Sequence, residues 1–331
     1  MSRAKRPLHV AAWRLVAGAA LLGLVGCGTD ATSSTGSGAA PHHHPSAARA
    51  PTHTAPEEWP SALPSDATLE GALPLGRPIV LYLDAGHGAQ SNPGNTSSFC
   101  VEEQDFTLGL ADDVADELAR TGRFVVDISR QGDARVAYAD RVSGAARGGA
   151  DVFVSLHSDV RGTTESWSPM VDTSCLRSFD APGFSVLWSD EGAPSLAARR
   201  HALAAGIAAS MTRQGWVPYE GAEYVGLYEA CGAKTGVFVD RHEMQKRIFV
   251  LRRTSMPAVI VETHNALDPR EAVAWEDGAV RRAFALALGR GIEDALTGHV
   301  ELAPPIPTQR AATTGSVAST SAPVAKSSPA P

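Results

Sequence analysis

Short apolar runs and helix-spaced apolar positions alternate along the middle of the chain. Apolar runs bounded by Gly, Pro, Asp or Arg predict strands. Phe106, Leu110, Val114 and Leu118 lie four residues apart, the pattern of an amphipathic helix. These patterns predict strands over 78–84, 124–129, 151–157, 183–189, 247–252 and 258–263, and helices over 105–121, 135–147, 194–215 and 278–296.

Strands that alternate with helices indicate an α/β fold, because each helix carries the chain back to the edge where the next parallel strand starts. Strands that read as continuous apolar runs are covered on both faces. We therefore expect a single domain with a mostly parallel, twisted sheet flanked by helices on both faces. Functional groups in such sheets gather at the carboxyl ends of the strands.

The first residues have the features of an export signal. Basic residues precede an apolar stretch over 15–26, which is too short to span a bilayer. The stretch ends in LVGC at 24–27, which resembles the lipobox where bacterial lipoproteins are cleaved and acylated on cysteine. We expect 1–26 to be a lipoprotein signal peptide and Cys27 to be lipidated. The alternative is a plain secretory signal with a chance cysteine.

Low-complexity segments flank the predicted domain. Residues 27–74 are rich in Ser, Thr, Ala, Pro and Gly, which predicts a flexible linker between a lipid anchor and the domain. The alternating pattern occupies 75–298. Residues 299–331 have a similar low-complexity composition and are expected to be a disordered tail.

Composition narrows the classes of function. The 331 residues are 44% hydrophobic and 20% charged, and the formal net charge is −7. A protein that binds nucleic acid usually carries a basic stripe with interleaved aromatic residues, and none is present in the sequence. We therefore expect no nucleic-acid partner.

Three predicted strands end near a side chain that can bind a metal or move protons. His87 follows the first strand between two glycines, His157 ends the strand over 151–157, and Glu262 lies near the end of 258–263. Glu103 lies just before the first predicted helix. Two imidazoles and one carboxylate suit zinc and leave a fourth position for water, as in catalytic zinc sites. A second carboxylate would then take the proton of that water.

Spacing alone leaves other interpretations open. The two histidines could be held by hydrogen bonds in strand-end loops. Paired carboxylates such as Asp84 and Glu262 could serve a glycosidase, although that reaction gives neither histidine a role. The sequence contains no G-x-S-x-G motif, which argues against a serine hydrolase of that type.

Several motifs resemble, in order, those of the zinc-dependent N-acetylmuramoyl-L-alanine amidases called the amidase-3 family. The family's Asp-Pro-Gly-His-Gly-Gly is similar to LDAGHGA at 83–89, and its Glu-x-Asp-x-x-Leu to EQDFTL at 103–108. Its Ser-Ile-His-Ala-Asn is similar to SLHSD at 155–159, and VLRRTSMPAVIVETHN at 250–265 resembles its last conserved strand region. Arg130 and Arg141 match two family arginines. The resemblance covers roughly 77–297.

This resemblance implies roles for four residues. His87, Glu103 and His157 would hold Zn²⁺, and Glu262 would be the catalytic base. The bond cut would be the amide between the lactyl group of N-acetylmuramic acid and L-alanine of the peptidoglycan stem peptide. Peptidoglycan is then the substrate, and the chain would lie in the cell envelope, lipid-anchored to a membrane and facing the periplasm or wall. An activator protein is a further candidate partner.

The sequence departs from the family pattern near the expected site. Asp159 replaces the usual asparagine, His264 and Asn265 replace a glycine and an aromatic residue, and 161–182 reads as an insertion. Strand alternation would place His264 on the same side as Glu262. We expect Asp159, His264 and Asn265 to contact the substrate or line the rim of the site.

Two other functions fit the same residues. The chain could be a catalytically silent, amidase-fold lipoprotein that binds peptidoglycan or regulates its turnover. It could also be a zinc peptidase that cuts a bond within the stem peptide. The products released from peptidoglycan distinguish all three functions.

Three cysteines remain once Cys27 is assigned to acylation. An exported protein meets an oxidising compartment, so we expect two of Cys100, Cys175 and Cys231 to pair and one to stay free. All three lie in predicted loops, and all three pairings are open. A pair that includes Cys175 is favoured, because it would pin the 161–182 insertion beside the site.

Overall fold

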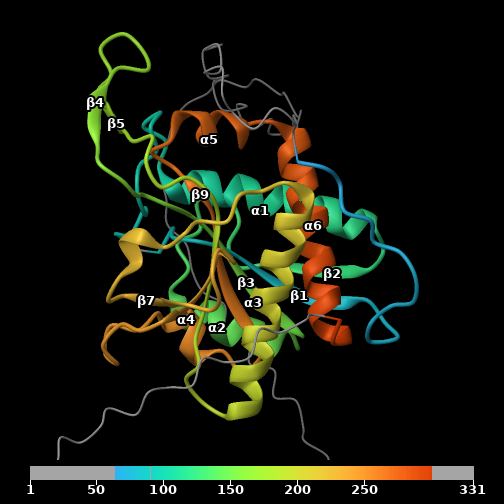
Figure 1. The fold of residues 1–331 in the computed structure, drawn as a ribbon. Coiled ribbons are helices and arrows are strands. Elements are labelled where there is room, and N and C mark those ends of the chain that lie inside the picture. The colour runs from blue at the N-terminus through green and yellow to red at the C-terminus, as the bar shows by residue number, and fades with distance from the viewer. Residues whose placement is uncertain (1–63, 90, 300–331) are drawn as a thin grey trace, which may run out of the picture. The chain divides into compact units, whose positions relative to one another are not determined.

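The computed structural model describes residues 64–89 and 91–299 (Figure 1). The predicted signal peptide, Cys27, most of the linker and all but the first residue of the tail lie outside the described residues. The elements in chain order are β1 (Ile79–Ala85), α1 (Glu103–Arg120), β2 (Phe124–Ile128), α2 (Tyr138–Arg147), β3 (Val152–Asp159), β4 (Glu165–Trp167), β5 (Cys175–Arg177), β6 (Ser185–Trp188), α3 (Pro194–Gln214), the 3-10 helix η1 (Ala222–Tyr224), β7 (Tyr228–Ala230), β8 (Val237–Asp240), α4 (Phe249–Arg253), β9 (Ala258–Asn265), α5 (Pro269–Ala274) and α6 (Gly278–Thr297).

A mixed seven-stranded sheet with the order β2-β1-β3-β9-β6-β8-β7 forms the centre of the described region. The four strands β2, β1, β3 and β9 run parallel to one another. β6 pairs antiparallel with β9, β8 runs parallel to β6, and β7 returns antiparallel to β8. The expected α/β fold with a mostly parallel sheet is confirmed, with a reversal of direction between β9 and β6.

Helices cover both faces of this sheet. The helices α1, α3 and α6 cover one face of the sheet (Figure 1). They pack on the odd-numbered side chains of β1 and β9, such as Leu83 and Val261. On the other face, α2 and α4 pack on Tyr82, Phe153 and Ile260. Side chains two apart on a strand share a face, so Asp84, Ser155, His157 and Glu262 all extend from the α2/α4 face, toward the carboxyl ends of their strands.

The strand predicted over 247–252 is wrong. The segment is the short helix α4, which buries Val250 and Leu251 against the second face of the sheet. A short apolar run does not distinguish a buried strand from a buried helix. The chain needs a crossover between β8 and β9 at this point, and a helix covers the sheet there.

The 161–182 insertion contains a two-stranded hairpin, β4 and β5, which projects from the body of the domain (Figure 1). A disulfide joins Cys100, in the loop before α1, to Cys175, and Cys231 is free. The expected pairing of two of these three cysteines, with Cys175 as one of them, is therefore confirmed. Cys175 itself lies in β5 and not in a loop as predicted. The pattern also predicts no element for β7, β8 or α5, because these segments are short.

The domain begins earlier than position 75. Residues 64–74, predicted to be the end of the linker, pack against it: Ser65 N–H donates to Gln214 O at 2.9 Å, and Ala67 is buried. Arg123 donates from its guanidinium to Gly71 O at 3.0 Å. Within 64–89 and 91–299, no helix combines the length and apolar character needed to cross a membrane.

Candidate metal centre

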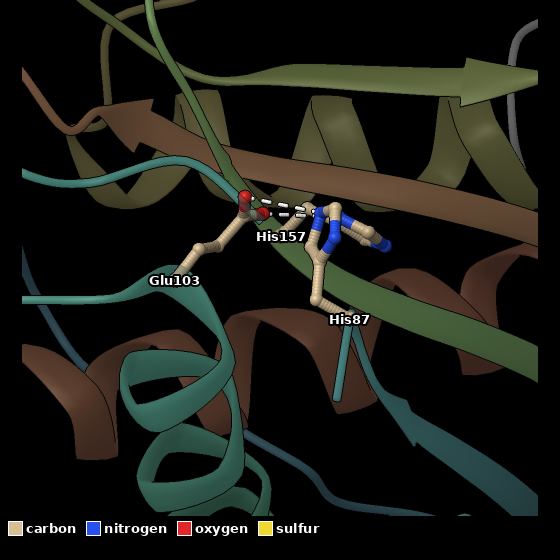
Figure 2. A group of neighbouring side chains, drawn as sticks. All are labelled: His87, Glu103 and His157. Atoms are coloured by element: carbon tan, nitrogen blue, oxygen red, sulfur yellow. Dashed lines mark hydrogen bonds and ion pairs between the residues drawn. The ribbon is translucent and has the colours of Figure 1, made fainter. Parts of the chain in front are cut away.

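Three of the predicted site residues meet at the carboxyl edge of the sheet. His87 follows β1, Glu103 begins α1, and His157 lies near the end of β3 (Figure 2). One ligand atom of each lies within 4.8 Å of the other two. The Glu103 carboxylate lies between the imidazoles, with Oε2 3.0 Å from His87 Nε2 and Oε1 3.0 Å from His157 Nδ1. This is the one such group of three or more acidic, His or Cys ligands among the described residues.

The backbone around His87 takes a conformation that ordinary residues avoid. Its φ is +58°, in the left-handed region, and Gly88 follows with φ +65°. Non-glycine residues held in this region cluster at functional sites. A Cβ on Gly86 would lie 2.6 Å from His157 Nε2, and one on Gly88 would lie 2.7 Å from the Arg130 guanidinium carbon. The glycines on both sides of His87 therefore provide room for other parts of the site.

Glu103 is the most constrained of the three ligand candidates. Its side chain is 2% exposed, and its carboxylate accepts backbone N–H groups from Asn95 and Ser158 at 3.0 Å each. Burial alone would raise the pKa of Glu103. The hydrogen bonds and charges of His157 and His87 outweigh burial and hold that pKa below its ordinary value. Glu103 is therefore an ionised carboxylate with a fixed orientation.

The hydrogen bonds of His87 show that a cation fits this centre. Asn92 Oδ1 lies 3.0 Å from His87 Nδ1, and it also accepts Gly94 N–H at 3.3 Å while Asn92 Nδ2 donates to Tyr138 Oη at 2.7 Å. An amide oxygen only accepts, so His87 Nδ1 must carry a proton. In the neutral ring, Nε2 then directs a lone pair at Glu103 Oε2. Two such atoms repel at 3.0 Å unless a second proton or a metal ion lies with them.

Glu262 extends beside this centre from the neighbouring strand. It is the cross-strand partner of His157 in the parallel β3–β9 pair, so both side chains lie on one face. Glu262 is half-buried, and its Oε2 is a buried oxygen without a hydrogen-bond partner among the described residues. Burial and the nearby Asp159 and Glu103 carboxylates raise the pKa of Glu262 well above its ordinary value, against the opposing charge of Arg161.

The other predicted rim residues have different surroundings. Asp159 is partly exposed and accepts a hydrogen bond from Tyr224 Oη at 2.5 Å, beside Glu262. Asn265 is fully buried: its side chain accepts from Arg161 N–H and donates to Arg161 O and Asp180 O. Asp159 therefore lies near the candidate base, whereas Asn265 ties together two loops.

His264 does not share a face with Glu262 as strand alternation predicts. β9 carries one extra residue opposite β3 in this segment, because Glu262 pairs with His157 but Asn265 pairs with Asp159. This bulge turns His264 to the other face, where it stacks on Trp275 and meets Phe106 edge-on. His264 is 3% exposed. Burial lowers its pKa to about 3, so the ring is neutral.

Two buried arginines hold the His87 loop. Arg130 donates to Ala85 O at 3.0 Å and to Gly86 O at 3.1 Å. Arg141 is fully buried and donates to the Asp84 carboxylate at 2.9 Å and to the carbonyl oxygen of His87. The two arginines singled out by their motif positions therefore support the loop that carries the first histidine.

Sequence reasoning missed several supporting residues. Asn92 and Asn95 come from a loop without periodicity, so no pattern marks them. Ser155 did carry a signal, because it lies two residues before His157 on a strand and therefore on the same face. Its Oγ lies 3.1 Å from His157 Nε2.

The chain is similar to known proteins of one family. The Amidase_3 family model, described as N-acetylmuramoyl-L-alanine amidase, matches residues 81–294, which include all four candidate site residues. The N-acetylmuramoyl-L-alanine amidase AmiC of Neisseria meningitidis serogroup B is 26% identical over 239 residues, which cover 66% of this chain and 53% of that protein. AmiC of Escherichia coli O6:H1 is 34% identical over 83 residues, 25% of this chain and 20% of that protein. The chain thus matches about half of one curated relative and a fifth of the other.

A solved structure shows the same fold. The crystal structure of the N-acetylmuramyl-L-alanine amidase Ami1 from Mycobacterium smegmatis superposes with a TM-score of 0.53 at 20% sequence identity. The match covers 69% of this chain and 100% of that chain. Because the family model spans well over half of the sequence, the chain belongs to the Amidase_3 family, described as N-acetylmuramoyl-L-alanine amidase.

Proposed function

We propose that this chain is a zinc-dependent N-acetylmuramoyl-L-alanine amidase that hydrolyses peptidoglycan. One observation carries the proposal: Glu262, with an unpartnered carboxylate oxygen, lies next to a converging His87, Glu103 and His157. Nitrogen, nitrogen and carboxylate donors form a ligand set of catalytic zinc sites, which keep one position open. Family membership supplies the substrate class.

In this proposal, His87 Nε2, His157 Nδ1 and the Glu103 carboxylate would hold zinc. Zinc bound there would polarise the amide carbonyl and lower the pKa of water. Glu262 takes a proton from the water that attacks the carbonyl carbon. As the C–N bond breaks, Glu262 returns that proton to the nitrogen of the departing L-alanine. The products are a lactyl carboxylate on N-acetylmuramic acid and a stem peptide with a free amino end.

The surroundings of Glu262 suit a group that takes and returns a proton. Burial and two neighbouring carboxylates stabilise its protonated form, and the Arg161 charge opposes them. A base with a raised pKa holds the proton long enough to deliver it to a leaving amine. We assign Asp159, held by Tyr224, to positioning beside Glu262. We assign Asn265 and His264 to support of the fold, since neither is accessible.

We further propose that the enzyme acts in the cell envelope as a lipoprotein, with 1–26 as the signal peptide, Cys27 acylated, 27–63 as the tether and 299–331 as a tail. The lipobox-like LVGC supports this assignment. Expression of the full chain and of Cys27→Ser, followed by membrane fractionation and mass analysis of the N-terminal peptide, tests it. Equal fractionation of the two chains and no acyl mass would contradict lipidation.

Digestion of purified sacculi tests the reaction. The amidase should release whole stem peptides that begin with L-alanine, and a chelator should abolish release until zinc is restored. A zinc peptidase would release truncated stems and leave L-alanine on the glycan. A silent binding protein would sediment with sacculi and release nothing. Either of the last two results would replace the proposed function.

A further inference from the structure

A series of buried hydrogen bonds begins at Nε2 of His157, on the side of the ring opposite Glu103. His157 Nε2 lies 3.1 Å from Ser155 Oγ, and Ser155 Oγ lies 2.6 Å from Asp84 Oδ2. Arg141 NH1 donates to Asp84 Oδ1 at 2.9 Å. Ser155 and Asp84 are cross-strand partners in the β1–β3 pair, which explains their close approach. Asp84, Ser155 and Arg141 are each 1% exposed or less.

The positions of the protons along these hydrogen bonds follow from which groups can donate. Asp84 forms an ion pair with the buried guanidinium of Arg141, and a carboxylate in an ion pair only accepts hydrogen bonds. The Ser155 hydroxyl therefore donates its single proton to Asp84. Its oxygen can then only accept from the ring, so His157 Nε2 must carry a proton. The neutral imidazole is left with its lone pair on Nδ1, which is the atom that faces Glu103.

The same guanidinium also contacts the backbone of His87, the other candidate histidine ligand. Arg141 donates to the carbonyl oxygen of His87 and, through NH1, to Ala85 O at 2.9 Å. Its contacts therefore extend to the backbone of one candidate ligand and, through Asp84, to the ring of the other. Arg141 therefore links the backbone of one candidate ligand to the hydrogen-bonded groups behind the other.

We propose that Asp84 and Ser155 are positioning residues that set the tautomer of His157, so that Nδ1 is the metal-binding nitrogen. This inference rests on the proposed role of His157 as a ligand. It assigns a function in metal binding to a serine and an aspartate that do not touch the metal. Outer hydrogen-bond partners of ligand histidines change metal affinity about 10- to 100-fold when they are removed.

Two substitutions separate this role from simple packing. Ser155→Ala removes the acceptor for Nε2–H and should weaken zinc binding about 10- to 100-fold. Asp84→Asn keeps the shape of the side chain, but it reverses the direction of donation along these hydrogen bonds. Arg141 takes the amide oxygen, so the amide NH₂ donates to Ser155, whose hydroxyl now donates to His157 Nε2. The proton of the neutral ring then moves to Nδ1, and zinc affinity should fall further than with Ser155→Ala.

The double variant provides the sharpest comparison. Without the Ser155 hydroxyl, the amide at position 84 cannot change the tautomer of His157. The double variant, Ser155→Ala with Asp84→Asn, should therefore bind zinc no more weakly than Ser155→Ala alone. If each substitution instead damaged the structure independently, their losses of zinc-binding free energy would add in the double variant. Ser210→Ala is the matched control, because Ser210 is a buried serine in α3 whose hydroxyl has no partner among the described residues. It should leave zinc affinity unchanged.

Zinc affinity is measured by competition with a chelator, and folding of each variant by thermal unfolding. Nitrogen-15 NMR of imidazole in the wild-type, zinc-loaded chain gives a direct reading that needs no variant. His157 should show a protonated Nε2 and a metal-bound Nδ1. Zinc on Nε2, wild-type affinity in both single variants, or additive losses in the double variant would each overturn the inference. If the chain binds zinc as described but releases no stem peptide, the inference stands and the proposed function fails.

Discussion

At the scale of single residues, the candidate centre depends on a glycine beside it, Gly94. Gly94 has φ +84°, and a Cβ there would lie 2.5 Å from Glu103 Oε2 and 2.7 Å from His87 Cγ. Those atoms belong to two of the three ligand candidates, and neither can shift freely. Glu103 is held by two backbone N–H groups, and His87 by Asn92.

Gly94→Ala should therefore lose most of its affinity for zinc. The matched control is Gly226→Ala, because Gly226 has nearly the same φ, +83°, and a Cβ there meets no atom within 4 Å. Both variants pay the strain of a left-handed alanine, about 1–3 kcal/mol of unfolding free energy. Only Gly94→Ala should lose zinc in a chelator competition. Equal zinc affinity in the two variants would show that the crowding is relieved elsewhere.

Glu262→Gln separates proton transfer from metal binding. The amide keeps the shape of the side chain but accepts no proton, so release of stem peptide should fall about 100- to 10,000-fold. Zinc content and sedimentation with sacculi should stay at wild-type values. Glu243→Gln serves as the control, because the Glu243 side chain is 81% exposed and forms a surface ion pair with Lys246. Loss of zinc in Glu262→Gln would make Glu262 a ligand and not a base.

At the scale of elements, the bulge in β9 turns two side chains that are two residues apart to opposite faces of the sheet. Glu262 stays on the face of His157, while His264 turns into an aromatic pocket of Phe106 and Trp275 on the α1 face. Thr263 Oγ donates to His157 O at 2.9 Å and thereby fastens the bulge to β3. An extra residue in a strand commonly re-aims side chains next to active sites.

The β4–β5 hairpin is fastened to the loop that leads into Glu103. Cys175 is bonded to Cys100, and Trp167 Nε1 donates to Ser98 O at 2.7 Å. Residues of the hairpin segment, Leu176 among them, line a cavity of about 370 Å³ that Asn95 also lines. The insertion therefore adds a wall near the candidate centre and is held there covalently.

Removal of this disulfide should destabilise the domain. Cys100→Ser with Cys175→Ser opens a crosslink between residues 75 apart in sequence. Native disulfides of this kind stabilise by about 2–4 kcal/mol, mainly because they restrict the unfolded chain. Urea unfolding should show that loss, while the control Cys231→Ser, at the free cysteine, should lose less. Equal unfolding free energies in the wild type and the double variant would contradict a stabilising bond.

At the scale of the whole molecule, a buried carboxylate connects β9 and β6, the two strands between which the sheet reverses direction. Glu271 in α5 accepts Gly183 N–H at 2.9 Å and Asn265 N–H at 2.8 Å, so it connects the start of β6 to the end of β9. Burial raises the pKa of Glu271 from 4.5 to about 7, against the two backbone hydrogen bonds and the Arg161 charge.

This shift makes the stability of the fold depend on pH. The folded state favours protonated Glu271. The free energy of unfolding that this preference contributes is therefore full below pH 4.5 and is lost as the pH rises to about 7. The loss is up to about 3 kcal/mol. Glu271→Gln stays neutral, so the difference in unfolding free energy between wild type and variant should shift in favour of the variant from pH 5 to pH 8. A difference that does not change with pH would show that Glu271 is ionised throughout.

The local patterns of the sequence predict the fold class and most elements, and its resemblance to the amidase-3 family predicts the four residues of the proposed chemistry. These signals are local. Apolar runs mark buried strands, and His87, His157 and Glu262 stand at or near strand ends, where a parallel sheet must bring them together. The strand predicted over 247–252 failed for the same local reason, since a short apolar run fits the helix α4 equally well.

The tertiary structure alone decided how those residues face one another. The bulge that turns His264 away from Glu262 exists only in the pairing of β9 with β3. The partner of Cys175 depended on which loop meets the hairpin. The nitrogen that His157 presents to Glu103 depends on Ser155 and Asp84, which meet across two strands. Register, loop contacts and proton positions arise from segments distant in sequence, so no local pattern encodes them.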